Sequence, residues 1–163
     1  MWNQITHLAA LVPLYLSIKY MYFTLAIFLT ITVAFSVIHH ADPHDETWLN
    51  VDELMSSLLV ALSLILYVGR MPVLTPLVIL TIVLGVVYDM LVEAMLVVFV
   101  MYIVVLFAHE EAIDTPLQIS LLLQTGSAGL FLLEGEFAHG WWHVLAFLSL
   151  AALIEHVKTQ RLI

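Results

Sequence analysis

The chain has 163 residues, of which 63% are hydrophobic and only 10% are charged. Soluble domains are roughly half apolar and about a quarter charged, so a soluble fold of this length could not bury so much apolar surface. The formal net charge is −9 and the four basic residues form no cluster, so we expect no nucleic-acid partner. Cysteine is absent, which excludes disulfides and thiolate metal ligands. We expect one integral membrane domain, residues 1–163.

Short polar stretches divide the chain into seven apolar runs. A transmembrane helix needs about 20 apolar residues, and open strands would leave backbone groups unpaired in lipid. The first and fourth runs are short for a span, and the fourth could instead be half of a broken helix. In chain order the predicted helices are Ile5–Ile18, Tyr20–His40, Leu49–Gly69, Val73–Tyr88, Met90–Ala108, Pro116–Leu133 and His139–Val157. The sequence therefore predicts an all-α bundle of seven transmembrane helices.

The basic residues predict how this bundle is oriented. With seven spans, Lys19 falls in the first loop, Arg70 in the third loop, and Lys158 and Arg161 in the C-terminal tail, all on one side. Basic residues accumulate on the cytoplasmic side of membrane proteins. We therefore expect the N-terminus outside and the C-terminus in the cytoplasm.

This topology brings three polar clusters together at the exoplasmic side. The second helix ends in "FSVIHH", where Ser36 and His40 are four residues apart and share one face. The third helix begins near Asp52. The seventh begins with "HGWWH", where His139 and His143 again share one face. Ionisable residues inside membrane helices are costly and usually functional.

Three imidazoles and one open position make a catalytic zinc site. His40, His139 and His143 are the predicted ligands, because a pair four apart on one helix can chelate an ion that a third histidine completes. Zinc would lower the pKa of a bound water toward about 7. Asp52 could then take the water proton, and Ser36 could hydrogen-bond the water or the oxyanion. A site near the membrane surface suits an amphiphilic lipid substrate.

Each of these signals also has an ordinary structural explanation. A single H-x-x-x-H pair is a weak motif, and the Trp141–Trp142 pair between its histidines is typical of membrane interfaces. Ser36 could hydrogen-bond to its own helix backbone. Asp52 could stabilise the helix dipole at an N-terminal turn.

Several other polar residues are weaker candidates. His39 points about 100° away from His40 around the helix. Glu93 lies about one turn into the fifth helix and needs a partner or water. We expect His7, His109 and His156 at membrane interfaces. The secondary site candidates are His39, Glu53, Glu93 and Trp142.

The combined pattern resembles a known superfamily. "SVIHH", an acid at the head of the next helix, and "HGWWH" heading the last helix are similar to the seven-helix metal-dependent membrane hydrolases. That superfamily includes the alkaline ceramidases, the progestin and adiponectin receptors and the myomaker-like proteins. "VDELM", Val51 to Met55, and "HGWWHVL" are similar to stretches of the alkaline ceramidases in particular.

The resemblance implies zinc held by His40, His139 and His143, with Asp52 and Ser36 assisting. It implies hydrolysis of a ceramide-like N-acyl sphingoid lipid to a sphingoid base and a fatty acid. The matching residues that carry the resemblance lie only in Ser36–Met55 and His139–Leu145. The three motifs together are specific to this superfamily, whereas no single one of them is.

Two other functions remain open at this stage. A receptor-like or structural member of the same superfamily would keep the metal without catalysis, and the sequence does not separate it from a hydrolase. A metal or proton transporter would need polar residues along a path through the bilayer, whereas here they cluster at one side. A retinal protein needs a lysine in the middle of the last helix, where this chain has none.

Overall fold

The computed structural model describes residues 5–42, 45, 47–48, 51–52, 54–56, 58–59, 62–63, 74–88, 90, 94, 97–98, 100–101, 104, 114–131, 133 and 136–161. Among these residues there are helices and turns but no strand, which confirms the all-α prediction. The elements are the 3-10 helix η1 (His7–Ala10) and the α-helices α2 (Leu11–Lys19), α3 (Phe23–Ala41), α5 (Leu74–Val87), α7 (Thr115–Phe131) and α8 (Glu136–Arg161).

Five predicted helices coincide with described elements, and the first of them differs in its form. It begins with the tighter turn η1 before it continues as α2. Pro13 explains this change, because it has no N–H to offer the carbonyl of Ala9 and its ring crowds that carbonyl. The described residues of segments 51–63 and 94–104 are helical as well. These segments correspond to the third and fifth predicted helices.

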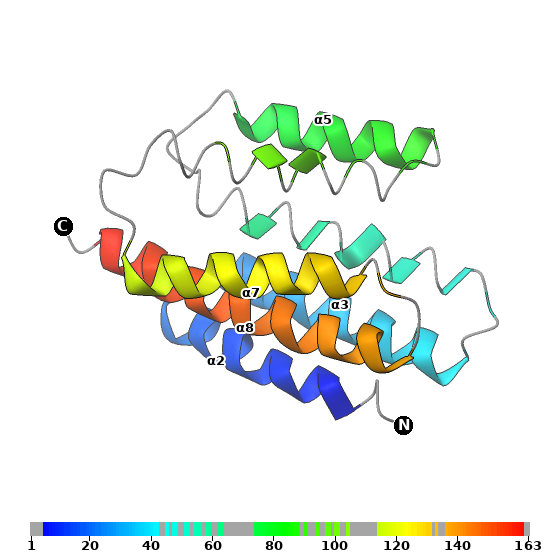
Figure 1. Ribbon diagram of the computed structural model, residues 1–163, viewed down its shortest axis with the longest axis horizontal. Coiled ribbons are helices and arrows are strands. Elements are labelled where there is room, and N and C mark those ends of the chain that lie inside the picture. Colours follow the sequence, from blue (N-terminus) through cyan, green and yellow to red (C-terminus); the bar gives the residue numbers. More distant parts are fainter. Residues whose placement is uncertain are drawn as a thin grey trace.

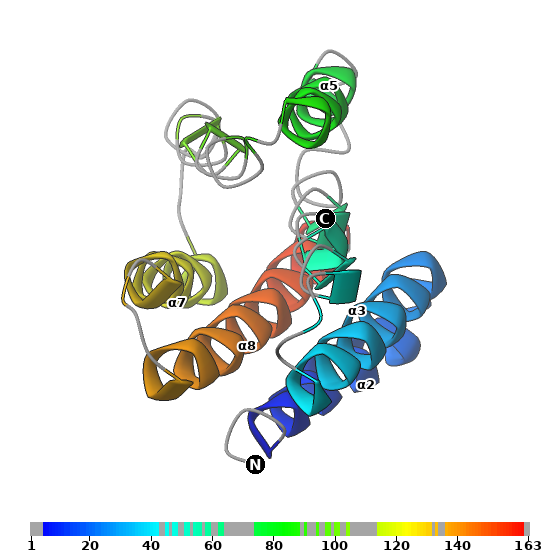
Figure 2. The ribbon, with the colours of Figure 1, turned by 90° about the vertical axis from the view of Figure 1, so that its right-hand side faces the viewer.

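Helix α8 is the longest element, with 26 residues, and it packs against α7, α2 and η1. Figures 1 and 2 show α7 antiparallel to α8 on one side and the α2–α3 pair on the other. Helix α5 lies apart from all four, at the top of both views. The chain reverses between α2 and α3 at Met21, whose φ of 62° is left-handed. The last turn of α3 therefore reaches the same end of the bundle as η1 and the start of α8.

Two serine contacts lock α7 to α8. Ser120 and Ser149 are both buried, and each hydroxyl donates to the carbonyl of the other residue, at 3.0 and 2.9 Å. Ser127 donates to the carbonyl of Trp142 at 3.4 Å. On each helix the two partners are seven residues apart, which is two helical turns. Small residues that let backbones approach, joined by interhelical hydrogen bonds, are typical of membrane helix pairs.

The end of the bundle opposite η1 and the start of α8 carries an ionic group. Asp114 precedes α7 and accepts from the backbone N–H of Leu117 at 3.0 Å, as an N-cap residue does. The same carboxylate oxygen, Oδ1, lies 2.9 Å from Nδ1 of the buried His156 on α8. Since His156 follows His143 by 13 positions, this group lies about 20 Å along α8 from that histidine.

Two of the four basic residues also lie at this end. Lys19 Nζ and Lys158 Nζ lie 5.2 and 4.9 Å from the centre of the Tyr20 ring. The Tyr20 hydroxyl donates to Glu155 Oε1 at 2.7 Å, and Lys158 lies 3.9 Å from the other oxygen of that carboxylate. The end of the bundle opposite the histidines therefore holds Lys19 and Lys158 together.

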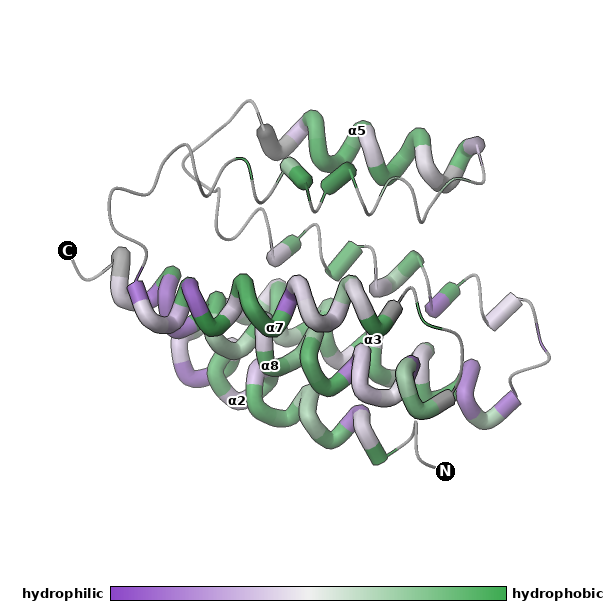
Figure 3. Tube along the Cα trace, in the orientation of Figure 1, coloured by the Kyte–Doolittle hydropathy of each residue, from purple (hydrophilic) through white to green (hydrophobic). Residues whose placement is uncertain are grey.

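Within the described part of the chain, two helices are long and apolar enough to cross a membrane: α3 and the stretch Phe137–Thr159 of α8. Helix α5 has 14 residues and spans about 21 Å, less than the roughly 30 Å of a hydrocarbon core. Hydrophobic residues dominate the middle of the described helices, and hydrophilic ones gather mostly toward their ends (Figure 3). Many large apolar side chains are exposed on α2, α3 and α5, as they are in a protein surrounded by lipid.

The serine contacts predict a measurable loss of stability. Ser120→Ala and Ser149→Ala should each lower the free energy of unfolding in micelles by about 1 kcal/mol, because each removes a buried interhelical hydrogen bond. The double variant should lose less than the sum of the two, since both changes break one reciprocal contact.

Thr125→Ala is the matched control. The Thr125 hydroxyl is exposed and bonds only within α7, to the carbonyl of Leu121. A loss in Thr125→Ala as large as that in the serine variants would contradict the interhelical role.

Candidate metal centre

Three imidazole nitrogens form a small triangle at one end of the bundle. The Nε2 atoms of His40 and His139 are 3.2 Å apart, those of His139 and His143 are 3.1 Å apart, and those of His40 and His143 are 3.3 Å apart. These are the three histidines that the sequence predicts as metal ligands. They come from positions far apart in the chain, and the fold brings their ε-nitrogens to one point.

The helices position these side chains directly. His40 lies in the last turn of α3, and His139 and His143 lie on the first turns of α8. Their spacing of four residues puts the α8 pair on one face. The rings stand edge-on, with His139 and His143 at 80° and His40 and His143 at 90°. His143 is buried, with 3% of its surface exposed, and His40 and His139 are partly buried.

Hydrogen bonds among the three rings cannot satisfy this triangle. Each neutral ε-nitrogen either carries a proton or offers a lone pair. With two kinds of atom at three corners, at least one contact must pair two protons or two lone pairs. A cation among three lone pairs removes the conflict for all three contacts. The cluster could therefore hold a metal ion.

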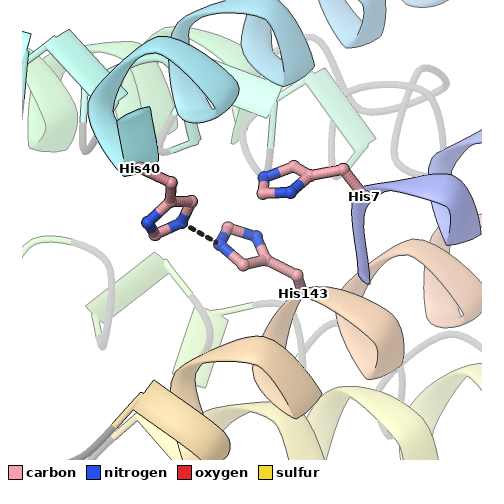
Figure 4. Close-up of side chains that lie close together, drawn as sticks. All are labelled: His7, His40 and His143. Atoms are coloured by element: carbon pink, nitrogen blue, oxygen red, sulfur yellow. Dashed lines mark hydrogen bonds between the residues drawn. The ribbon is translucent and has the colours of Figure 1, made fainter. Parts of the chain in front are cut away.

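A fourth histidine, His7 of η1, joins this group. One ring nitrogen each from His7, His40 and His143 lie within 4.8 Å of one another, and this trio could also hold a metal ion. Figure 4 shows the three rings converging from η1, α3 and α8. The His7 ring centre lies 4.5 Å from that of His143 and 5.4 Å from that of His40. His7 is only 5% exposed.

Sequence reasoning placed His7 at an interface and missed its part in the centre. No spacing motif links His7 to the other histidines. The available signal was topological, since the predicted topology already starts the first helix at the end of the bundle where the other three histidines lie. His156, also expected at an interface, is buried and bonded to Asp114.

Ser36 lies in this centre through His7. Its Oγ is 2.8 Å from His7 Nε2, and the side chain is 1% exposed. This is the only hydrogen bond of the Ser36 side chain to the described part of the chain. The alternative that Ser36 simply bonds to its own helix backbone is therefore not what the structure has.

The two possible ligand sets share His40 and His143 and differ in the third member. The set with His139 is tighter, because all three of its ε-nitrogens are within 3.3 Å of one another. Nε2 of His7 already bonds Ser36. We therefore favour His40, His139 and His143 as the ligands, with His7 beside them.

Asp52 is buried, with 4% of its surface exposed, in the segment that follows α3. The Thr32 hydroxyl contacts the carbonyl of Met55 at 3.3 Å, so this segment runs back along α3. Ser36 lies one turn after Thr32, and Asp52 lies about one turn before Met55. This antiparallel register puts Asp52 at about the level of Ser36 along the bundle.

The secondary candidates have different outcomes. The ring of Trp142 packs against both α8 ligands, with centres 4.4 Å from His143 and 5.2 Å from His139. His39 lies on the packed face of α3, and its Nδ1 is buried with no hydrogen-bond partner among the described residues. Glu53 and Glu93 lie outside the described residues.

Comparison of the chain with known proteins adds no relative. No family model matches it, and neither a curated protein nor a solved structure does.

Proposed function

We propose that the protein is a zinc-dependent intramembrane hydrolase that cleaves a lipid amide, with ceramide-like N-acyl sphingoid lipids as the substrate class. The observation that carries this proposal is the triangle of His40, His139 and His143 ε-nitrogens inside an apolar helical protein. The motifs that resemble those of the alkaline ceramidases support the choice of substrate.

The spacing of the triangle suits zinc. Nitrogen ligands about 2.0–2.1 Å from a tetrahedral zinc ion are about 3.3–3.4 Å apart. The observed separations of 3.1–3.3 Å are close to this value. Three histidines leave one position open, as in catalytic zinc sites, whereas structural sites have four protein ligands. A donor set made only of imidazoles excludes calcium and magnesium, which prefer oxygen.

The nearby residues supply the groups that amide hydrolysis needs. A zinc ion bound here would make water more acidic and polarise the substrate carbonyl. Asp52 takes the proton of the attacking water as its oxygen bonds to the carbonyl carbon. Ser36 stabilises the oxygen on which negative charge develops. When the carbon–nitrogen bond breaks, Asp52 returns the proton to the leaving amine, which gives a fatty acid and a sphingoid base.

The distribution of charge supports a site near the exoplasmic face. The histidines lie at one end of the bundle, and Lys19 and Lys158 lie together at the other, which the positive-inside rule assigns to the cytoplasm. Seven spans with the N-terminus outside satisfy both placements. A lipid can then present its amide at the histidines while its acyl chains stay among the helices.

A second candidate function is a metal-stabilised receptor-like or structural protein without catalysis. The observation that favours it is His7, because a fourth imidazole on the ion would close the open position. Four histidine ligands would leave no place for water. The two candidates therefore predict different coordination.

Metal analysis tests the ligand set. Purified protein should contain about one zinc ion per chain, and His139→Ala should lose most of it, because two remaining imidazoles chelate zinc weakly. The measurement is elemental analysis of the detergent-purified protein. His156→Gln is the matched control, since it alters a buried histidine at the other end of α8 and should keep the metal. Full zinc content in His139→Ala would contradict the assignment.

Asp52→Asn separates catalysis from structure. The amide cannot take a proton from water, so hydrolysis of ceramide-type lipids should fall at least about 100-fold while zinc content and thermal stability stay unchanged. The assay follows release of the free sphingoid base. If the wild-type protein binds zinc but hydrolyses no ceramide or other lipid amide, the hydrolase proposal fails and the structural candidate stands.

A further inference from the structure

We propose that His7 is a positioning residue that holds the Ser36 hydroxyl at the open side of the metal centre, and that it is not itself a metal ligand. This inference rests on the proposed hydrolase and adds a role that the sequence motifs do not contain. It explains why η1 brings a buried histidine to a centre that already has its three ligands.

The hydroxyl of Ser36 bonds a side chain of another helix, whereas six other helical hydroxyls bond their own backbone. Ser and Thr side chains in helices usually bond the carbonyl four residues earlier, which turns the hydroxyl along its own backbone. This bond is present in all of the following residues: Thr30, Thr32, Ser63, Thr81, Thr125 and Thr159. Ser36 bonds His7 Nε2 at 2.8 Å instead. His7 therefore turns this hydroxyl away from the α3 backbone.

His7 is itself held firmly in this position. It is 5% exposed and belongs to the 3-10 turn that Pro13 imposes. Its ring packs against His143 at 4.5 Å and lies 6.4 Å from Phe147, between ring centres. A ring confined on these sides cannot swing freely, so its Nε2 gives Ser36 a partner at a defined point.

The same bond argues against His7 as a ligand through Nε2. A ring nitrogen has one lone pair or one proton, so Nε2 cannot serve both Ser36 and a metal ion. Ligation by Nε2 would require the 2.8 Å contact to break and would leave the Ser36 hydroxyl, which is 1% exposed, without this partner. The bond to Ser36 therefore rules out Nε2 as a ligand atom, and the metal-content test below decides whether Nδ1 binds the ion.

Holding Ser36 in advance has a catalytic purpose. In the proposed arrangement Nε2 of His7 carries its proton and donates it to Ser36 Oγ, so the single hydroxyl proton of Ser36 remains free for the oxygen on which negative charge develops. The hydroxyl of Ser36 is then directed away from the α3 backbone before substrate arrives. Groups oriented in advance stabilise developing charge without reorganisation during the reaction.

Metal content is the first test, and it does not depend on activity. His7→Phe keeps a ring of similar size and removes both nitrogens, and His7→Gln keeps a polar group that can reach Ser36. Both variants should retain about one zinc per chain. Loss of zinc in both variants would overturn the proposal and identify His7 as a ligand.

Kinetics on the hydrolysed lipid amide is the second test. His7→Phe and Ser36→Ala should each lower kcat about 10- to 100-fold with little change in KM, as loss of a supporting group near a metal site does. The double variant should be no worse than either single one, and His7→Gln should recover part of the rate. Thr30→Ala, on the same helix, is the control and should keep the wild-type rate. Additive losses in the double variant would overturn the proposal.

Cobalt substitution decides the question if the wild-type protein hydrolyses no lipid. The visible spectrum of bound cobalt(II) reports its coordination. His7→Phe and Ser36→Ala should bind cobalt fully and shift the spectrum in the same way, with no further shift in the double variant. An unchanged spectrum in both, or a change in His7→Phe alone, would overturn the pairing. Failure of the hydrolase proposal and failure of this inference are therefore distinguishable.

Discussion

The candidate centre depends on one physical constraint, the approach of three imidazole nitrogens to within 3.3 Å of one another in an apolar protein. Lone pairs at this distance repel unless a cation or protons lie between them, and lipid supplies neither. The ends of α3 and α8 must meet at one level for the triangle to form. The turn at Met21 and the antiparallel pairing of α7 with α8 produce this meeting.

The two ends of the bundle differ in their chemistry, and the difference is a consequence of where charge can be solvated. At one end, imidazoles from η1, α3 and α8 converge. At the other, Asp114, Glu155 and Lys158 pair with His156 and Tyr20. Ionic groups near the membrane surface keep access to water, and groups set deeper must find partners within the protein. The bundle thus separates structural ion pairs from the candidate centre.

The sequence predicted the helices from local patterns, and it predicted the grouping of His40, His139 and His143 from the topology that those helices imply. Run lengths gave the helix positions, and a spacing of four placed His139 and His143 on one face. The basic residues of the predicted loops gave a topology in which His40 lies at the same level as this pair. The sequence could not predict the His7–Ser36 bond, because no motif links the two residues and the rotation of the first helix about its axis depends on packing. It also could not predict the tight first turn of the N-terminal helix, since the effect of Pro13 on the residues before it depends on packing.

The order in which the ligands occur along the chain has a consequence for biosynthesis. His40 precedes His139 by 99 positions, so it is synthesised well before the two histidines of α8. A partly inserted chain holds a single member of the proposed ligand triad and cannot chelate an ion with it. For the proposed metal centre, loading with the ion would therefore be a late step of assembly, because an incomplete chain lacks two of the three proposed ligands.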